Sequence, residues 1–139
     1  MTIPDTPFGA RVRERLRDET FVWLTTVDEH GTPQPNPVWF LWDGADTVLV
    51  YNDNRARRLD RFEAGCRVSL AFQAGPDGMD FVVLTGMAEL APDAPAPQAN
   101  DEYLAKYSTD IAALGGDVSG FAQRYDVPIR IRIERVRGF

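Results

Sequence analysis

The chain is built from short runs of alternating apolar and polar residues, most of which end in a glycine-containing turn. Residues 21–27 are followed by a turn at 28–32, and residues 33–42 by the dipeptide Asp-Gly at 43–44. Because successive side chains point to opposite faces of a strand, the runs predict β-strands and the tight turns predict hairpins. Such a succession folds into an antiparallel sheet or a small barrel, and it excludes a helical bundle.

Four further runs complete a set of six expected strands. The alternation in residues 79–90 is interrupted by Gly86, which predicts a bulge or a close approach of another backbone segment. In residues 128–136 isoleucine occupies every second position and predicts the face that packs in the core. Six strands with helices at their edges make a mainly β, single-domain barrel over residues 1–139. The other strands are expected at residues 47–51 and 66–74, and helical segments at 8–17, 55–64, 100–107, 110–114 and 119–125.

The run 33–42 has proline at its first, third and fifth positions. Since proline lacks an N–H group and the strand period is two, one edge of this strand cannot donate to a ladder there. This edge must face solvent or a ligand. Two large aromatic residues, Trp39 and Phe40, follow, and such residues pack in a core or form the wall of a cofactor site. The candidate binding residues of the segment are Asn36, Pro37, Val38 and Trp39.

Composition limits the compartment and the classes of partner. The chain has 139 residues, 44% of them hydrophobic, which is enough for one domain with a core. Its net charge of −6 argues against a protein that binds nucleic acid or an anionic membrane through overall charge. The apolar runs are too short to span a bilayer and the N-terminal residues lack a secretion-signal pattern, so we expect a cytoplasmic protein.

The chain has few residues that could bind a metal ion or act as a catalytic nucleophile. The chain has one cysteine and one histidine, Cys66 and His30, which are far apart in sequence. A zinc or iron site needs several such ligands at converging spacings. We therefore expect His30 in a solvated turn and Cys66 in the core, and we assign neither a metal nor a catalytic residue. Chemistry is expected from a bound cofactor.

The positive charge is almost all arginine, with Lys106 as the exception, and it is gathered at residues 11–17, 55–67 and 124–137. The central group opens an expected helix directly after a strand. A helix N-terminus carries partial positive charge, so arginines beside it suggest an anion site. An alternative is a solvated face whose arginines pair with nearby carboxylates. The candidate residues are Tyr51, Asn52, Arg55, Arg57 and Arg58, with Asn52 or Asn54 as a cap or a phosphate donor.

The order of these elements and five motifs resemble the pyridoxamine-phosphate-oxidase-like flavoproteins. The motifs are Asp28-x-x-Gly-x-Pro, Pro37-Val-Trp-Phe-x-Trp-Asp-Gly, Tyr51 followed by the arginine-rich helix start, Arg67-Val-Ser-Leu and Gly86-x-Ala-Glu-Leu. The resemblance covers nearly the whole chain. Within this superfamily the chain is most similar to the short actinobacterial branch that uses the deazaflavin coenzyme F-420.

The resemblance implies a six-stranded split β-barrel of the FMN-binding type and a homodimer with two cofactor sites along its interface. In the family, the strand matching residues 37–40 lines the flavin or deazaflavin ring, and the strand end at Tyr51 and Asn52 contacts the cofactor chain. The basic pair that binds the phosphate falls on Arg57 and Arg58, the second of which is usually lysine. The longer polyanionic tail of F-420 makes Arg55, Arg61 and the arginines of residues 11–17 further candidates.

The function implied is hydride transfer between F-420 and a small acceptor of the enone, quinone or tetrapyrrole class. FMN is an alternative cofactor with the same phosphate site. A second alternative is a protein that carries a flavin, deazaflavin or haem without catalysis, in which only Tyr51 or a methionine could ligate haem iron. The chain lacks the C-terminal substrate-phosphate motif of true pyridoxamine phosphate oxidases, so we do not expect that reaction.

Overall fold

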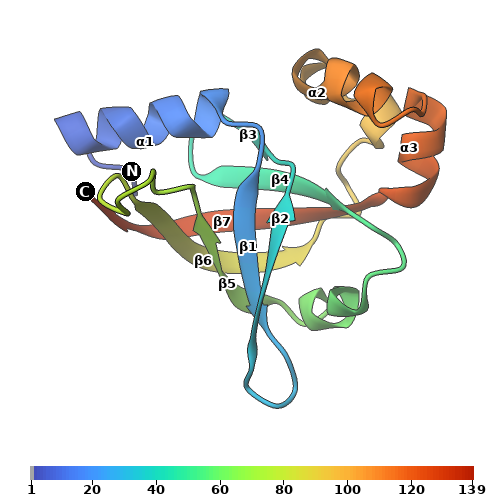
Figure 1. Ribbon diagram of the computed structural model, residues 1–139. Helices are drawn as coiled ribbons and strands as arrows, with labels where there is room; N and C mark the ends of the chain where they lie inside the picture. The colour runs from blue at the N-terminus through green and yellow to red at the C-terminus, as the bar shows by residue number, and fades with distance from the viewer. Residues whose placement is uncertain (1) are drawn as a thin grey trace.

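The computed structural model describes residues 2–139, apart from the side chains of Arg57 and Arg58. One seven-stranded sheet, in the order β2-β1-β5-β6-β7-β4-β3, curls into a half-barrel (Figure 1). Neighbouring strands are antiparallel throughout. The strands are β1 Val22–Val27, β2 Pro33–Val38, β3 Leu41–Trp42, β4 Thr47–Asn52, β5 Cys66–Ala71, β6 Val82–Leu90 and β7 Val127–Gly138; the helices are α1 Pro7–Asp18, η1 Arg57–Phe62, η2 Pro97–Ala99, α2 Asp101–Ala113 and α3 Val118–Arg124.

The sheet has seven strands and not the six expected, because the run 33–42 is broken into β2 and β3. The break falls at Phe40, whose backbone groups bond to side chains of α2 and not to a neighbouring strand. Its N–H donates to the Tyr107 hydroxyl at 2.9 Å, and its carbonyl accepts from Lys106 Nζ at 3.0 Å. A helix thus satisfies the backbone at the point where the strand leaves the ladder.

Gly86 lies at an irregularity in the pairing of β6 with β7. The register shifts between Thr85 and Gly86, and a Cβ atom at position 86 would lie 1.8 Å from the carbonyl oxygen of Arg132. Both expectations for this glycine, a bulge and a close backbone approach, are confirmed.

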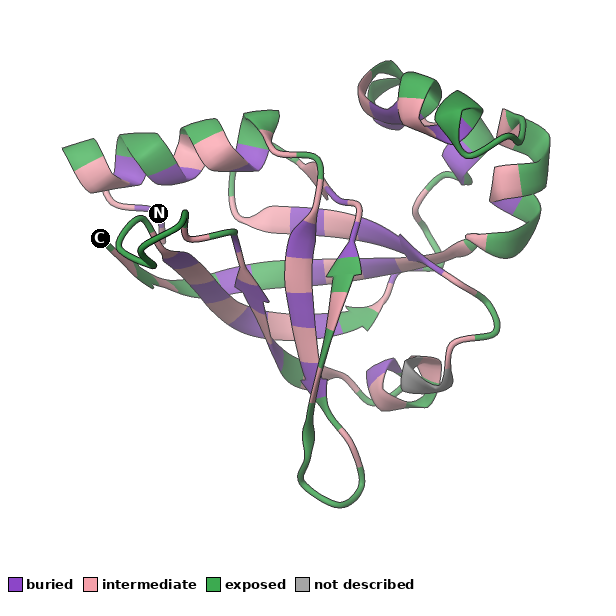
Figure 2. Ribbon diagram, in the orientation of Figure 1, coloured by how far each residue is buried: buried purple, intermediate pink, exposed green. Residues whose placement is uncertain are grey.

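The core fills the inside of the curled sheet. Figure 2 shows buried residues alternating with less buried ones along the strands, and in β7 the buried residues are Ile129, Ile131 and Ile133, as expected. Helix α1 adds Val12 and Leu16, which are also buried. Its N-terminus follows the sequence signals, since the Thr6 hydroxyl accepts from the N–H of Gly9 and proline occupies the first turn.

The other helices differ from the expectations at their ends. The α-helix expected over residues 55–64 is a six-residue 3-10 helix, η1, which has no side-chain cap. The two segments expected at 100–114 join into the single helix α2, which Asn100 caps. Helix α3 is capped by Asp117 and not by Ser119, as its carboxylate accepts from the N–H of Gly120 at 2.7 Å.

A second, smaller core lies outside the barrel, where α2 and α3 pack beside β4 (Figure 1). Its buried members are Tyr51 of β4 and Tyr103, Tyr107 and Ile111 of α2. Along residues 2–139, none of the helices combines the length and the apolar character needed to cross a lipid bilayer.

Candidate functional site

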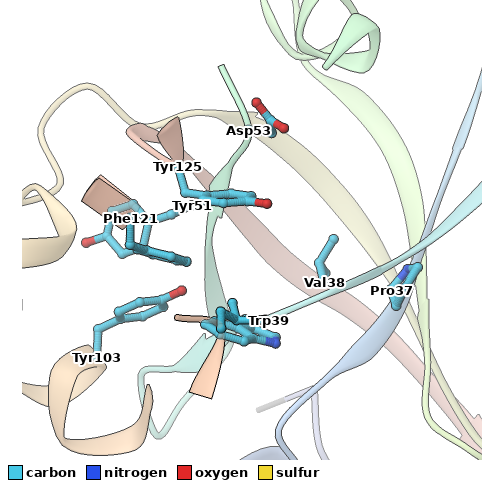
Figure 3. A pocket seen from close by; sticks show the side chains of 9 residues that line it. Pro37, Val38, Trp39, Tyr51, Asp53, Tyr103, Phe121 and Tyr125 are labelled. Atoms are coloured by element: carbon cyan, nitrogen blue, oxygen red, sulfur yellow. The ribbon is translucent and has the colours of Figure 1, made fainter. Parts of the chain in front are cut away.

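A cavity with mostly aromatic walls lies where this second core meets the end of β2. Its volume is about 280 Å³. The side chains in Figure 3 come from the C-terminal ends of β2 and β4, from the residues that directly follow them, and from the segments of α2 and α3. The site thus brings together segments that are more than 60 residues apart in sequence. The lining residues are Pro37, Val38, Trp39, Tyr51, Asp53, Tyr103, Leu114, Phe121 and Tyr125.

The rings around this cavity are arranged for stacking. Trp39 lies parallel to Tyr107, with ring centroids 4.7 Å apart, and is stacked on Phe121 at 5.5 Å. Phe121 in turn stacks on Tyr125 at 4.7 Å. Because these rings stack on one another, they form an aromatic wall with few charges, which favours an apolar, conjugated ligand over a highly polar one.

Two of the buried tyrosine hydroxyls at this site are fully engaged. The Tyr51 hydroxyl donates to the carbonyl of Pro95 at 2.6 Å and accepts from the Asn100 side-chain amide at 3.0 Å. The Tyr107 hydroxyl accepts from the Phe40 N–H and lies 2.7 Å from the carbonyl of Thr20. Burial raises the pKa of both phenols, so both are neutral near pH 7.

A second cavity, of about 600 Å³, is lined in part by Gln34 and Asn36 of β2 and is polar. Its walls carry three carboxylates and, among the described side chains, one cation, Arg61. Hydrogen bonds from the backbone N–H of Thr32 and the side chain of Gln34 hold the pKa of Asp28 below its usual value. The described charges alone therefore disfavour an anion. The lining residues are Asp28, Glu29, Gln34, Asn36, Ala56, Asp60 and Arg61.

The segment from Asp53 to Ala56 connects the two cavities, since its first residue lines the aromatic cavity and its last lines the polar one. Asp53 organises it by accepting from the N–H of Arg55 at 2.9 Å and binding the Arg124 guanidinium at 2.9 Å. These bonds, first that with Arg124, hold the pKa of Asp53 below its usual value. The Arg55 side chain is 70% exposed and lies 3.9 Å from the same carboxylate.

The expected capping by asparagine is wrong. Asn52 is buried and its amide donates to the carbonyl of Asp53 at 3.3 Å. The Asn54 amide donates to the carbonyl of Gln123, which ties the segment to α3. Neither caps η1, and a helix this short has little dipole to offer an anion. The predicted phosphate contact thus rests on Arg57 and Arg58, whose side chains lie outside the described part.

Strand β2 forms one edge of the sheet and pairs only with β1. Its three prolines pair with Val27, Thr25 and Trp23 of that strand. Proline cannot donate, so these are the pairs that exchange no hydrogen bonds, and their carbonyls face the open edge. The prediction of an edge without donors is confirmed, and the edge next to the aromatic cavity offers only acceptors.

The sequence-predicted site residues are thus divided between neighbouring places. Pro37, Val38, Trp39 and Tyr51 line the aromatic cavity, and Asn36 lines the polar one. The sequence did not predict that α2 and α3 contribute to the site. Two tyrosines four residues apart in a helix indicate that this face is buried, and they do not indicate a binding site. The lining residues missed were Asp53, Tyr103, Leu114, Phe121 and Tyr125.

Neither cavity contains a set of side chains arranged to hold a metal ion, as far as the described residues show. Across the described residues, no three histidine, cysteine or acidic side chains are placed to hold a metal ion. The His30 side chain is 80% exposed in the β1–β2 turn. Cys66 is partly buried, and burial raises the pKa of its thiol, which is the behaviour of a packing residue and not of a nucleophile.

Comparison with protein families identifies the family of this chain. Residues 8–138 match the family of pyridoxamine 5'-phosphate oxidase. The chain belongs to this family. The resemblance inferred from its motifs is therefore confirmed, and so is the split-barrel fold. Comparison with curated proteins gives no match.

Solved structures similar to this pyridoxamine 5'-phosphate oxidase family member have different ligands in their names. An F-420 reductase gives a TM-score of 0.63 at 20% identity, over 90% of this chain and 94% of the other. The haem storage protein HutZ from Vibrio cholerae gives 0.59 at 13%, over 96% and 95%. A FAD and haem binding protein from Mycobacterium smegmatis gives 0.62 at 13%, over 91% and 68%. Sequence identities this low establish the shared fold only. The ligand of this protein has to be inferred from the residues of its own site.

Proposed function

We propose that this protein is an oxidoreductase that binds coenzyme F-420 and transfers hydride to a small conjugated acceptor. The observation that carries the proposal is the pairing of two cavities along β2. The aromatic one suits a flat ring, and the polar one is lined by Arg61 and by Ala56, which directly precedes Arg57 and Arg58 in sequence. We propose that these arginines offset the carboxylates of the polar cavity and bind the anionic tail. When bound, the deazaflavin supplies the hydride, and the chain supplies position and exclusion of water.

The walls of the aromatic cavity favour a ring cofactor over haem. Haem iron is held in proteins by histidine, cysteine, methionine or tyrosine. Among the described lining residues only tyrosines qualify, and the hydroxyl of Tyr51, the ligand expected from sequence, is bound to Pro95 and Asn100. Burial also raises the pKa of Tyr51, which opposes the tyrosinate that iron would require.

The position of Arg55 favours F-420 over FMN. Its side chain is exposed on the segment that joins the two cavities, where it could contact the tail of F-420, which is longer and more anionic than that of FMN. FMN would need only the phosphate contact at Arg57 and Arg58. We further propose a homodimer in which the partner covers the open side of β2, since that strand is unpaired at this edge.

Titration of the purified protein with F-420, FMN and haemin distinguishes these ligands. We expect F-420 to bind most tightly, with quenching of the tryptophan fluorescence to which Trp39 contributes. Reduced F-420 should then be reoxidised by a quinone or an enone much faster with the protein than without it. Binding of haemin alone would contradict the proposal, and F-420 binding without turnover across acceptors would indicate a carrier.

The phosphate contact has its own test. The double variant Arg57→Ala/Arg58→Ala should weaken cofactor binding by about 2–4 kcal/mol, or roughly 30- to 1,000-fold, because charge-assisted phosphate contacts are lost. Arg67→Ala is the matched control, as Arg67 is exposed and pairs with Glu134 of β7 at 2.9 Å, away from both cavities. Equal affinity in the double variant and the control would place the phosphate elsewhere.

A further inference from the structure

The hydroxyl of Tyr103 is buried at the aromatic cavity and has no hydrogen-bond partner. The residue is 0% exposed, and its oxygen is one of two buried side-chain polar atoms without a partner in the described part of the chain. Figure 3 shows this oxygen directed toward the side chains of Trp39 and Phe121, whose rings are stacked. Leaving a buried hydroxyl unpaired is costly, and phenylalanine would fill the same volume at no such cost.

Neighbouring tyrosines show that this part of the protein is able to satisfy buried hydroxyls. Tyr107, one turn further along α2, is equally buried and contacts backbone groups of Phe40 and Thr20. Tyr51, whose ring meets that of Tyr103 edge-on at 4.8 Å, bonds to Pro95 and Asn100. Tyr103 differs from both because its oxygen is directed at a cavity and not at the backbone.

We propose that the aromatic cavity binds a flat conjugated ring bearing a carbonyl oxygen, and that this oxygen accepts a hydrogen bond from the Tyr103 hydroxyl. The stacked rings of Trp39 and Phe121 supply the apolar walls. The hydroxyl supplies the single polar contact that fixes the orientation of the ring. The inference builds on the proposed function, and it identifies the group that selects the ligand.

The electrostatics of the cavity agree with a neutral carbonyl ligand. Asp53 is the one charged residue among the described side chains of its wall, and it is already paired with Arg124. Burial raises the pKa of Tyr103, so its phenol keeps its proton across the neutral and mildly alkaline range and acts as a donor. Because the oxygen is covered, the proposed contact requires the surrounding rings, among them Phe121 with its centroid 6.2 Å from that of Tyr103, to shift when the ligand binds.

Fluorenone and fluorene are suitable probes, since they share a flat ring system and differ only in the carbonyl. We expect the protein without cofactor to bind fluorenone more tightly than fluorene, by about threefold to tenfold, which is one hydrogen bond. Quenching of tryptophan fluorescence measures both. Tyr103→Phe should bind the two probes equally and keep its affinity for fluorene. The control is Arg67→Ala, since Arg67 lines neither cavity, and it should retain the preference for the ketone.

The outcomes separate this inference from the proposed function. A wild-type protein without preference for fluorenone, or a Tyr103→Phe variant that keeps the preference, overturns the inference even if F-420 binds. A preference that depends on Tyr103 supports it even if F-420 fails to bind. Two sources of the carbonyl ring are then distinguished by competition. Loss of fluorenone binding on adding F-420 identifies the ring of the cofactor as the occupant, and simultaneous binding identifies a separate substrate.

Discussion

Tyr103 and Tyr107 lie one helical turn apart on α2, are equally buried, and have opposite roles. The Tyr107 hydroxyl bonds to the backbone that joins β2 to β3 and thereby stabilises the break between them. The Tyr103 hydroxyl contributes nothing to the fold and is available to a ligand. Sequence gives no means of separating the two, because the partner of each hydroxyl lies on another element. The sequence predicted a helix here, and only the packing of that helix shows which of the two hydroxyl oxygens has a hydrogen-bond partner.

The difference between the two hydroxyls should appear in the free energy of unfolding when each tyrosine is replaced by phenylalanine. Tyr107→Phe is expected to lower the free energy of unfolding by about 1–3 kcal/mol, because it leaves the N–H of Phe40 without its buried acceptor. Tyr103→Phe should leave that free energy unchanged or slightly higher, since it removes an unpaired hydroxyl and keeps the ring. Urea unfolding followed by circular dichroism measures both. A larger loss in Tyr103→Phe than in Tyr107→Phe would contradict these assignments.

Lys106 gives the protein an alkaline pH dependence. Its ammonium is partly buried against the Phe40 ring, 3.7 Å from the centroid, and burial lowers its pKa to about 8, with Asp18 acting in the opposite direction. The folded state thus releases this proton at a lower pH than the unfolded state does. Stability linked to Lys106 is complete above the unfolded pKa and falls as the pH drops through about 8.

Comparison with Lys106→Met tests this directly. The unfolding free energy of the wild type, relative to that of the variant, should rise by about 1–2 kcal/mol between pH 7.5 and about 10. Cys66 and the buried tyrosines have raised pKa values and lose stability above their unfolded pKa, but they do so in both proteins and cancel. Lys106 is the chain's single lysine, so no second lysine contributes. A constant difference across this pH range would contradict the burial of the ammonium.

At the scale of elements, the sequence predicted those that follow from a local pattern and missed those decided by a neighbour. The hairpin turns, the start of α1 and the face of β7 each depend on residues a few positions apart. The division into β2 and β3 depends on hydrogen bonds from α2. The shortening of η1 depends on the turn at Asp53. The candidate site divides in the same way, since its strand residues were predicted and its helical wall was not.

The β6–β7 bulge provides a prediction at this scale. Gly86→Ala would place a methyl group 1.8 Å from the Arg132 carbonyl oxygen, and backbone atoms on a paired strand cannot yield as a side chain can. We expect a loss of about 3 kcal/mol or more, or failure to fold, measured by thermal unfolding. Gly116→Ala is the control, because nothing lies within 4 Å of the added atom. Similar unfolding temperatures for the two variants would show that the strands separate easily.

For the whole molecule, exposed ion pairs set the response to acid. The carboxylates of Asp28, Asp53, Asp93 and Glu134 all have pKa values below their usual range, the last three chiefly through bonds to arginine side chains. Their stabilisation is present above the unfolded pKa, near 4, and is lost as the pH falls below it. The unfolding free energy should therefore decrease from pH 5 to pH 2. Because these pairs are exposed, 1 M salt should reduce the decrease, and an unaffected acid profile would contradict this origin.

The two ends of the sheet also have a consequence for crowded solutions. An open sheet invites a second molecule to add a strand at its edge, which is a common start of aggregation. Here β3 is two residues long, and the edge of β2 offers carbonyl oxygens without matching N–H groups. An incoming strand could therefore form at most half of its hydrogen bonds at β2. The prolines that leave one side of the binding region without donors also protect the protein from polymerising through its own sheet.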